Sequence, residues 1–207
     1  MAVTLVFPQR FKIPLLRLLA GWSIGSHAYV GFSYINADEV RIGEGVYIGH
    51  FNLVRNMKSF RVGPRSHIKN FNSFFGAATI AEHGFNSVME LGSGVLFMSH
   101  HFVDCAGTLQ VEDNVTIGGR STEIYTHQRN IKGGVPFLEP TTVHIGQNAY
   151  VAARCTLVSC IIPPDAVVGA GAVVVGDHQA DGTDGPVLLA GNPATVRKRY
   201  QPRLNST

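Results

Sequence analysis

Histidine is the side chain in this sequence best suited to moving a proton near neutral pH, and two polar stretches contain it. The first holds the adjacent pair His100 and His101, with Ser99 before it and Asp104 shortly after it. The second holds His127, which directly follows a threonine. Because free histidine titrates at about pH 6.5, these residues are candidates for general acid–base work. Whether they can act in this way depends on where the secondary-structure elements place their side chains.

The three cysteines, Cys105, Cys155 and Cys160, offer no competing chemistry. They cannot all pair with one another, and none stands in a CxxC motif. We expect buried free thiols in a reducing compartment. Prolines and cations interrupt the apolar residues near the N-terminus, so the layout is not that of a signal peptide, and we expect a cytoplasmic protein without a membrane span.

Composition indicates one globular domain. The chain has 207 residues, of which 45% are hydrophobic, and this argues against intrinsic disorder. Only 15% are charged, against about 25% in average soluble proteins. The formal net charge of +3 is too small and too scattered to favour a nucleic-acid partner.

A six-residue period runs through most of the chain. Its register is visible at Ile24-Gly25, Val30-Gly31, Ile42-Gly43 and Ile48-Gly49, and it returns as far as Val168-Gly169. Nineteen of 21 register positions carry Ile, Val, Leu or Phe, where chance would give about a third. The exceptions are Asn36 and Glu123.

A second set of positions, four residues after the first, carries mostly small or medium side chains. Examples are Val46, Val95 and Ala149, whereas His101 is a polar member. A period of six fits neither a helix nor an ordinary strand. It fits a coil with three flat faces, so the sequence predicts a solenoid that starts a new coil every 17–20 residues outside two interruptions.

The repeat, the run of residues 161–174 and the closing Ala190-Gly191-Asn192-Pro193-Ala194 resemble the hexapeptide-repeat acyltransferases. The resemblance covers about residues 22–200 and implies an all-β fold, a left-handed parallel β-helix. It also implies a homotrimer about a threefold axis. We expect three segments: an N-terminal cap over residues 1–23, the β-helix over 24–176 with loops near 76–90 and 125–144, and a C-terminal loop and tail over 177–207.

The cap contains a short amphipathic segment over residues 8–22. Phe11, Leu15, Leu18 and Leu19 share one face of it. We expect this face to pack on the core, and contact with a membrane surface is the alternative.

The resemblance assigns roles around the second interruption. His127 matches the general base of the family, which removes a proton from the acceptor as that acceptor attacks a thioester directly, without a covalent enzyme intermediate. Asp104 or Glu123 could orient His127, and a backbone carbonyl would serve equally well. A solvated loop histidine is the alternative for His127. Ser99, His100 and Asp104 match the region where the family often places acceptor contacts on the neighbouring subunit, whereas His101 falls on the inward side. A structural histidine pair is the alternative.

The resemblance also implies acetyl-CoA as the acyl donor. Small residues at Ala152, Ala153 and Ala170 match the places that line its pantetheine chain, although the repeat alone also explains small residues there. The threonine–lysine step that usually follows the last of these runs is absent. Arg197 and Lys198 are candidates for the phosphates, with a solvated basic tail as the alternative.

These assignments predict an acetyltransferase acting on a hydroxyl or amine of a saccharide or nucleotide sugar in polysaccharide biosynthesis. The saccharide rests on the family and on aromatic and polar residues of the first interruption. Those residues are Phe74, Phe75, His83, Phe85 and Asn86. Two other readings remain: a metalloprotein like the gamma carbonic anhydrases, which the histidine spacing disfavours, and a non-catalytic scaffold. We expect no metal.

Overall fold

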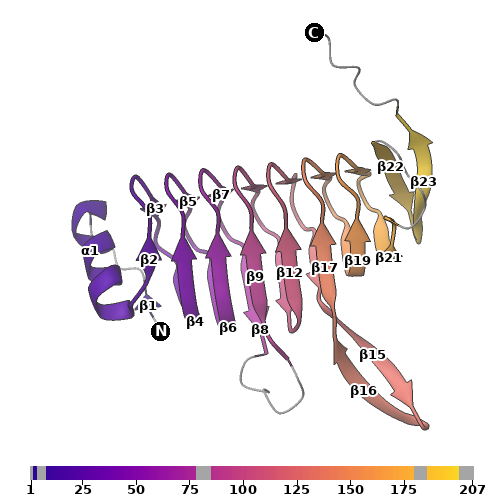
Figure 1. Ribbon diagram of the computed structural model, residues 1–207, viewed down its shortest axis with the longest axis horizontal. Coiled ribbons are helices and arrows are strands. Elements are labelled where there is room, and N and C mark those ends of the chain that lie inside the picture. The colour runs from indigo at the N-terminus through magenta and orange to yellow at the C-terminus, as the bar shows by residue number, and fades with distance from the viewer. Residues whose placement is uncertain (1, 4–7, 78–84, 180–185, 201–207) are drawn as a thin grey trace.

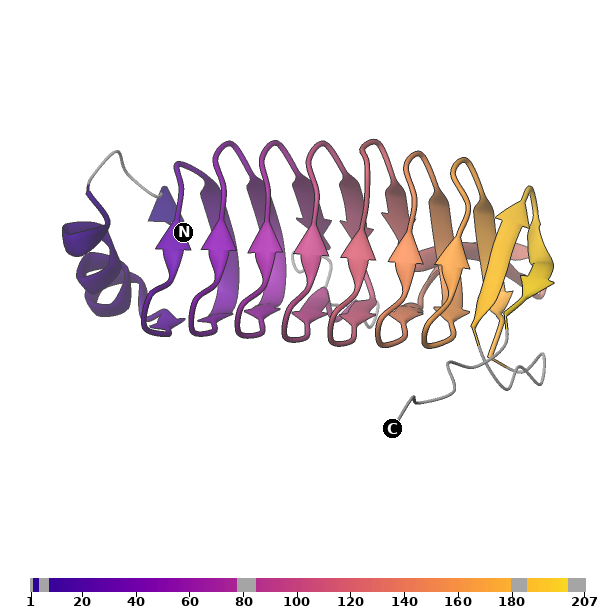
Figure 2. The same ribbon diagram turned by 90° about the horizontal axis from the view of Figure 1, so that it is seen from above.

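The chain winds into a stack of coils in which strands of one coil pair in parallel with those of the next (Figure 1). The computed structural model describes residues 2–3, 8–77, 85–179 and 186–200. Seen from above, successive coils lie side by side along one long axis (Figure 2). The six-residue period therefore folds as the sequence predicted: an all-β structure with stacked parallel strands.

Short strands form the first face of the stack. This nine-stranded sheet contains β3 (Tyr29–Val30), β5 (Tyr47–Ile48), β7 (His67–Ile68), β10 (Leu96–Phe97), β13 (Thr116–Ile117), β18 (Tyr150–Val151), β20 (Val167–Val168), β22 (Val187–Gly191) and β23 (Ala194–Arg199).

A twelve-stranded sheet forms the other two faces, because its long strands continue from one face to the next. It contains β1 (Ala2–Val3), β2 (Ser23–Ile24), β4 (Tyr34–Ile42), β6 (Leu53–Val62), β8 (Ser73–Gly76), β9 (Val88–Leu91), β11 (Phe102–Cys105), β12 (Thr108–Val111), β14 (Glu123–Tyr125), β17 (Thr142–Ile145), β19 (Thr156–Ile162) and β21 (Val173–Asp177). Strand β6 pairs with β8 at its start and with β9 at its end. We call the β8–β11–β14 side the second face and the β9–β12–β17 side the third face.

Two corners of the coil position the residues discussed below. The first corner joins the first face to the second and comprises the turns at residues 31–33, 49–52, 69–72, 98–101, 118–122, 152–155 and 169–172. The second corner joins the second face to the third, and both interruptions of the repeat leave the stack there (Figure 1).

Large apolar side chains at the register positions fill the core. All nineteen apolar residues at these positions are buried. The two exceptions were placed one residue off, because Ile35 (1% exposed) and Ile124 (0%) point inward in place of Asn36 and Glu123. The turn before Ile35 is one residue shorter than the period requires, and the turn before Ile124 is one residue longer.

The segments predicted as loops contain regular structure where they are described. The second interruption is an antiparallel hairpin of β15 (His127–Lys132) and β16 (Val135–Pro140). The first interruption lies partly outside the described residues. In the C-terminal segment, β22 adds to the first face beside β20, and β23 folds back on it, so that the last coil is covered by backbone pairing.

The N-terminal segment contains the helix α1 (Gln9–Ala20), which lies across the first coil (Figures 1 and 2). It contacts that coil through Leu16 and through polar groups. The Lys12 Nζ and Gln9 Nε2 donate hydrogen bonds to the Val30 carbonyl at 3.0 and 2.8 Å. The terminal strand of a sheet leaves such carbonyls without a strand partner, so polar side chains here satisfy the end of the stack.

The expected orientation of α1 is therefore wrong. The face that carries Phe11, Leu15, Leu18 and Leu19 does not pack on the core but is exposed to solvent. No helix among the described residues has the length and apolarity that crossing a bilayer requires.

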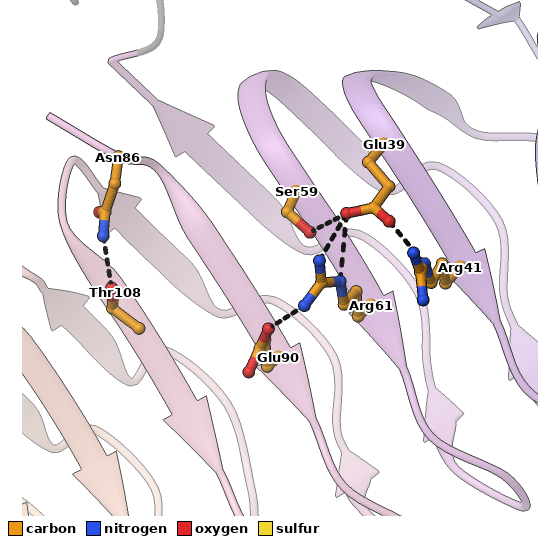
Figure 3. A network of polar contacts seen from close by, with 7 residues as sticks. All are labelled: Glu39, Arg41, Ser59, Arg61, Asn86, Glu90 and Thr108. Atoms are coloured by element: carbon orange, nitrogen blue, oxygen red, sulfur yellow. Dashed lines mark hydrogen bonds and ion pairs between the residues drawn. The ribbon is translucent and has the colours of Figure 1, made fainter.

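A network of charged side chains runs across the third face (Figure 3). Arg61 bonds both Glu39, at 2.6 Å, and Glu90, at 2.5 Å, while Arg41 bonds Glu39 at 2.5 Å. These groups are 34–63% exposed, so each pair adds little to stability. The network links neighbouring coils, and the cation of Arg61 is already matched by carboxylates on both sides.

Candidate active site

The hairpin leaves and re-enters the stack at one point, and this point fixes the position of His127. Thr126 is fully buried and ends the coil, because its carbonyl accepts the Thr141 N–H at 2.8 Å while its own N–H donates to the Asp104 carbonyl at 3.0 Å. Its Oγ1 accepts the Gly107 N–H at 2.8 Å. Residue 127 is thus held between a rigid coil and the exposed hairpin.

His127 faces Asp104 from the neighbouring coil. The His127 Nδ1 lies 3.6 Å from the Asp104 Oδ1, and the side chains are 23% and 35% exposed. The Nδ1 is buried, and no hydrogen-bond partner for it exists among the described residues. An imidazole whose Nδ1 faces a carboxylate has its Nε2 free for an incoming proton.

The two carboxylates that could orient His127 have different partners. Glu123 accepts a hydrogen bond from the Tyr125 hydroxyl at 2.9 Å, whereas Asp104 faces the imidazole. Burial raises the pKa of the Asp104 carboxyl, and the facing His127 opposes this effect. Asp104, predicted both as an acceptor contact and as a residue that could orient His127, is therefore the carboxylate that faces the imidazole.

A row of aromatic rings on the second face leads to His127. The ring centroids of Phe75 and Phe102 are 5.6 Å apart, those of Phe102 and Tyr125 6.1 Å, and those of Tyr125 and His127 6.3 Å. Phe102 and Tyr125 were not predicted as site residues from the sequence. The available signal was their outward position next to inward residues of the repeat.

The residues of the first interruption that were predicted to contact a saccharide do not all lie near His127. Phe74 is fully buried in the core and cannot contact a ligand. Asn86 donates a hydrogen bond to the Thr108 Oγ1 at 2.9 Å (Figure 3), and His83 lies outside the described residues. Phe75 of this set belongs to the row beside His127.

Ser99 and His100 lie at the first corner, at the other end of β11 from Asp104. The Ser99 Oγ accepts the Asn70 N–H at 3.1 Å, and the His100 ring stacks on Phe71 with centroids 5.0 Å apart. Four residues of strand span roughly 13 Å, so one chain does not bring His100 to the His127 site.

His101 is a structural residue, as its inward position predicted. It is 2% exposed, and its Nδ1 accepts the Thr122 N–H at 3.1 Å. Burial, with a smaller contribution from His100, lowers the pKa of His101 to about 4. His101 is therefore neutral at physiological pH and unavailable to a substrate.

The residues predicted to bind the acyl donor lie together at the C-terminal end of the first corner. The Ala152 N–H donates to the Val168 carbonyl at 3.0 Å, and the Ala153 carbonyl accepts the Gly171 N–H at 3.0 Å, which places Ala170 on the adjacent coil. The last hairpin reaches the same region.

That hairpin carries the two predicted cations. The Arg197 Nε donates to the Ala190 carbonyl at 3.2 Å, and Ala190 lies beside Gly169. Lys198 is exposed and lies over the Tyr200 ring, with its Nζ 4.8 Å from the centroid. The guanidinium is thus held near the small residues, and Lys198 remains in solvent.

The three cysteines are buried free thiols, as predicted. Burial raises the pKa of Cys105 and of Cys160 to about 12 and also raises that of Cys155. Thiols held protonated in this way are poor nucleophiles. Among the described residues, no three His, Cys, Asp or Glu side chains are grouped so that they could hold a metal ion.

The stack resembles solved structures of acyltransferases. A point variant of AntD, an N-acyltransferase from Bacillus cereus in complex with dTDP and coenzyme A, superposes with a TM-score of 0.52 at 13% identity, covering 94% of this chain and 91% of that one. A maltose O-acetyltransferase from Clostridium difficile 630 gives 0.45 at 20% identity, over 96% and 79%.

A third similar structure is the hexapeptide-repeat containing acetyltransferase VCA0836 from Vibrio cholerae O1 biovar eltor, complexed with acetyl coenzyme A. It gives 0.43 at 14% identity, over 96% of this chain and 81% of that one. No protein-family model matches the sequence. No curated protein matches it either. At these identities the similarity to AntD concerns the fold.

Proposed function

We propose that the protein transfers an acetyl group from acetyl-CoA to a hydroxyl or amine of a saccharide or nucleotide sugar. The observation that carries the proposal is the His127–Asp104 pair at the base of the hairpin. The pair lies in a chain whose fold is similar to that of AntD, an N-acyltransferase whose complex holds dTDP and coenzyme A. The stack is then a left-handed parallel β-helix over residues 24–176, flanked by an N-terminal cap and a C-terminal segment.

The reaction needs one general base and no covalent enzyme intermediate. As the acceptor oxygen or nitrogen bonds to the acetyl carbonyl carbon, the His127 Nε2 takes its proton. The tetrahedral intermediate then collapses, the carbon–sulfur bond breaks, and the departing thiolate of coenzyme A receives the proton from His127. Asp104 holds the imidazole by its Nδ1 and stabilises the imidazolium that forms.

A complete site requires two subunits. Asp104 and His127 lie at the second corner, whereas Ala152, Ala153 and Ala170 lie at the first. In a homotrimer each second corner can face the first corner of the next subunit. We therefore place the general base of one subunit opposite the donor groups of its neighbour.

The donor groove follows the small residues at the C-terminal end of the first corner. Small side chains allow the slim pantetheine chain to lie against the backbone. Arg197 is already oriented toward this end through the Ala190 carbonyl, and its guanidinium suits a phosphate of coenzyme A together with Lys198.

The acceptor site follows the aromatic row of Phe75, Phe102 and Tyr125. Aromatic faces with polar neighbours suit the apolar and hydroxyl sides of a sugar ring. Ser99 and His100 remain proposed acceptor contacts only across a subunit boundary. Such an enzyme would act in the cytoplasm, in polysaccharide biosynthesis.

Thiol release from acetyl-CoA tests the proposal. Wild-type protein is incubated with acetyl-CoA and a panel of sugars, amino sugars and nucleotide sugars, with acceptor-free reactions as controls. We expect thiol release that requires both donor and acceptor. If no acceptor supports release and calorimetry detects no binding of coenzyme A, the proposal is overturned.

A further inference from the structure

The apolar face of α1 is directed into solvent. Leu18 and Leu19 are 80% and 73% exposed, Phe11 is 58% exposed and Leu15 is 38% exposed. Their spacing places all four on one stripe of the helix. Exposed apolar stripes of this kind mark surfaces that another molecule covers.

The helix cannot hide this stripe by turning over. Its opposite side is tied to the first coil by Gln9 and Lys12, which bond the Val30 carbonyl, and by Arg17, whose Nη2 donates to the Ile24 carbonyl at 2.5 Å. Rotation would break these bonds and leave the carbonyls at the end of the stack unsatisfied.

The helix carries cations but no aspartate or glutamate. Two of the cations, Lys12 and Arg17, bond carbonyls of the first coil, which leaves Arg10 as the cation beside the stripe. The Arg10 guanidinium lies 4.7 Å from the centroid of the Phe11 ring, at the edge of the stripe. A phenylalanine and leucines bordered by a cation, on a helix without acids, fit the pattern of helices that lie in the interface of an anionic bilayer.

A second copy of the chain fits this surface less well. A 12-residue helix is about 18 Å long and about 10 Å wide, so one face offers roughly 180 Å², against about 800 Å² per partner in a stable protein interface. A symmetric pair would also place Arg10 near the Arg10 of the other copy, and α1 carries no acidic residue to match these cations.

We propose that α1 docks the protein on the surface of an anionic lipid bilayer. The Phe11–Leu15–Leu18–Leu19 stripe enters the boundary between headgroups and acyl chains, and Arg10 binds phosphate groups at its edge. The stack then stands away from the membrane, because α1 lies across its N-terminal end (Figures 1 and 2). This docking is independent of the acyl-transfer reaction.

Co-sedimentation with vesicles tests the docking. Wild-type protein is mixed with phosphatidylcholine vesicles and with vesicles that also contain phosphatidylglycerol. We expect clear binding to the anionic vesicles and much weaker binding to the neutral ones. Leu18→Glu combined with Leu19→Glu should weaken binding at least about tenfold. Arg10→Gln should weaken it about fivefold, through loss of one cation.

The control is Ile131→Glu combined with Val135→Glu, at residues 69% and 65% exposed on the hairpin. This variant removes apolar groups of similar exposure outside α1, and it should bind like the wild type. The proposal is overturned if the wild type binds neither vesicle or if the control loses as much binding as the α1 variant. It is also overturned if the α1 variant changes the oligomeric mass but not vesicle binding, because a second copy then covers the stripe.

Discussion

The orientation of one imidazole by one carboxylate is the basis of the proposed chemistry. Asp104→Asn keeps the size of the side chain but removes the charge that faces the His127 Nδ1. We expect kcat to fall roughly 10- to 100-fold, since the variant loses part of a general-base contribution of about 10²–10⁴, while the KM for acetyl-CoA stays unchanged. Glu123→Gln is the matched control, because Glu123 bonds Tyr125 instead. Equal losses in both variants would contradict the role of Asp104.

A second residue, His101, makes stability depend on pH. The unfolded chain binds a proton at His101 near a pKa of about 6.5, whereas the folded chain does so only near a pKa of about 4. Stability is therefore complete above pH 6.5 and falls as the pH drops from 6.5 to 4, by about 3 kcal/mol in total.

Urea denaturation at several pH values measures this dependence. His101→Asn should abolish most of it, since Asn72 holds the equivalent position one coil earlier and its Oδ1 accepts the His101 N–H at 2.9 Å. An asparagine can therefore accept the Thr122 N–H without titrating. His67→Gln, at an exposed position, should leave the dependence intact. A slope that survives in His101→Asn would show that other groups cause it.

At the scale of elements, Thr126 couples the hairpin to the coil. Thr126→Val removes the oxygen that accepts the Gly107 N–H and leaves that buried group unsatisfied. We expect a loss of about 1–3 kcal/mol in the free energy of unfolding, measured by urea denaturation. Thr126→Ser keeps the acceptor and should lose less. Equal losses would mean that packing of the methyl group matters more than the hydrogen bond.

The secondary-structure elements also show which parts of the fold could be predicted from the sequence. The register predicted nineteen buried positions correctly, because a narrow interior requires apolar side chains at a fixed spacing. It did not include Met57, Phe60, Met89, Leu109 and Val143, which are also buried. It failed at Asn36 and Glu123, where single-residue differences in turn length shift the strand. It also failed to predict the outward stripe of α1, because the carbonyls at the end of the stack attract the polar side of the helix. The sequence of the helix alone does not indicate that these carbonyls need hydrogen-bond donors.

The candidate site was predictable only in part. The sequence indicated His127 and two carboxylates that could orient it, and the choice between these carboxylates needed the coil-to-coil geometry. The row of Phe102 and Tyr125 was missed because its members are about one coil apart in sequence. Ser99 and His100 lie at a different corner from His127, so their predicted contact with the acceptor across a subunit boundary stays a prediction.

At the scale of the whole molecule, we predict that the site is shared between subunits of a homotrimer. Sedimentation should give three times the chain mass of 22.4 kDa. His127→Ala removes the base, and Ala170→Trp blocks the donor groove, so each variant alone should be inactive. Random mixed trimers should regain about a quarter of wild-type activity, because each site draws one half from each of two subunits. A site built within one chain would regain none.

The most direct test of the account compares the rate of thiol release in wild type and His127→Ala, with saturating acetyl-CoA and the best acceptor. We predict a loss of about 10²–10⁴-fold in kcat, the usual contribution of a general base, with unchanged affinity for acetyl-CoA by calorimetry. His67→Ala, which also removes an imidazole from the surface, should retain wild-type turnover. A His127→Ala protein that works within a few-fold of an active wild type would contradict the account.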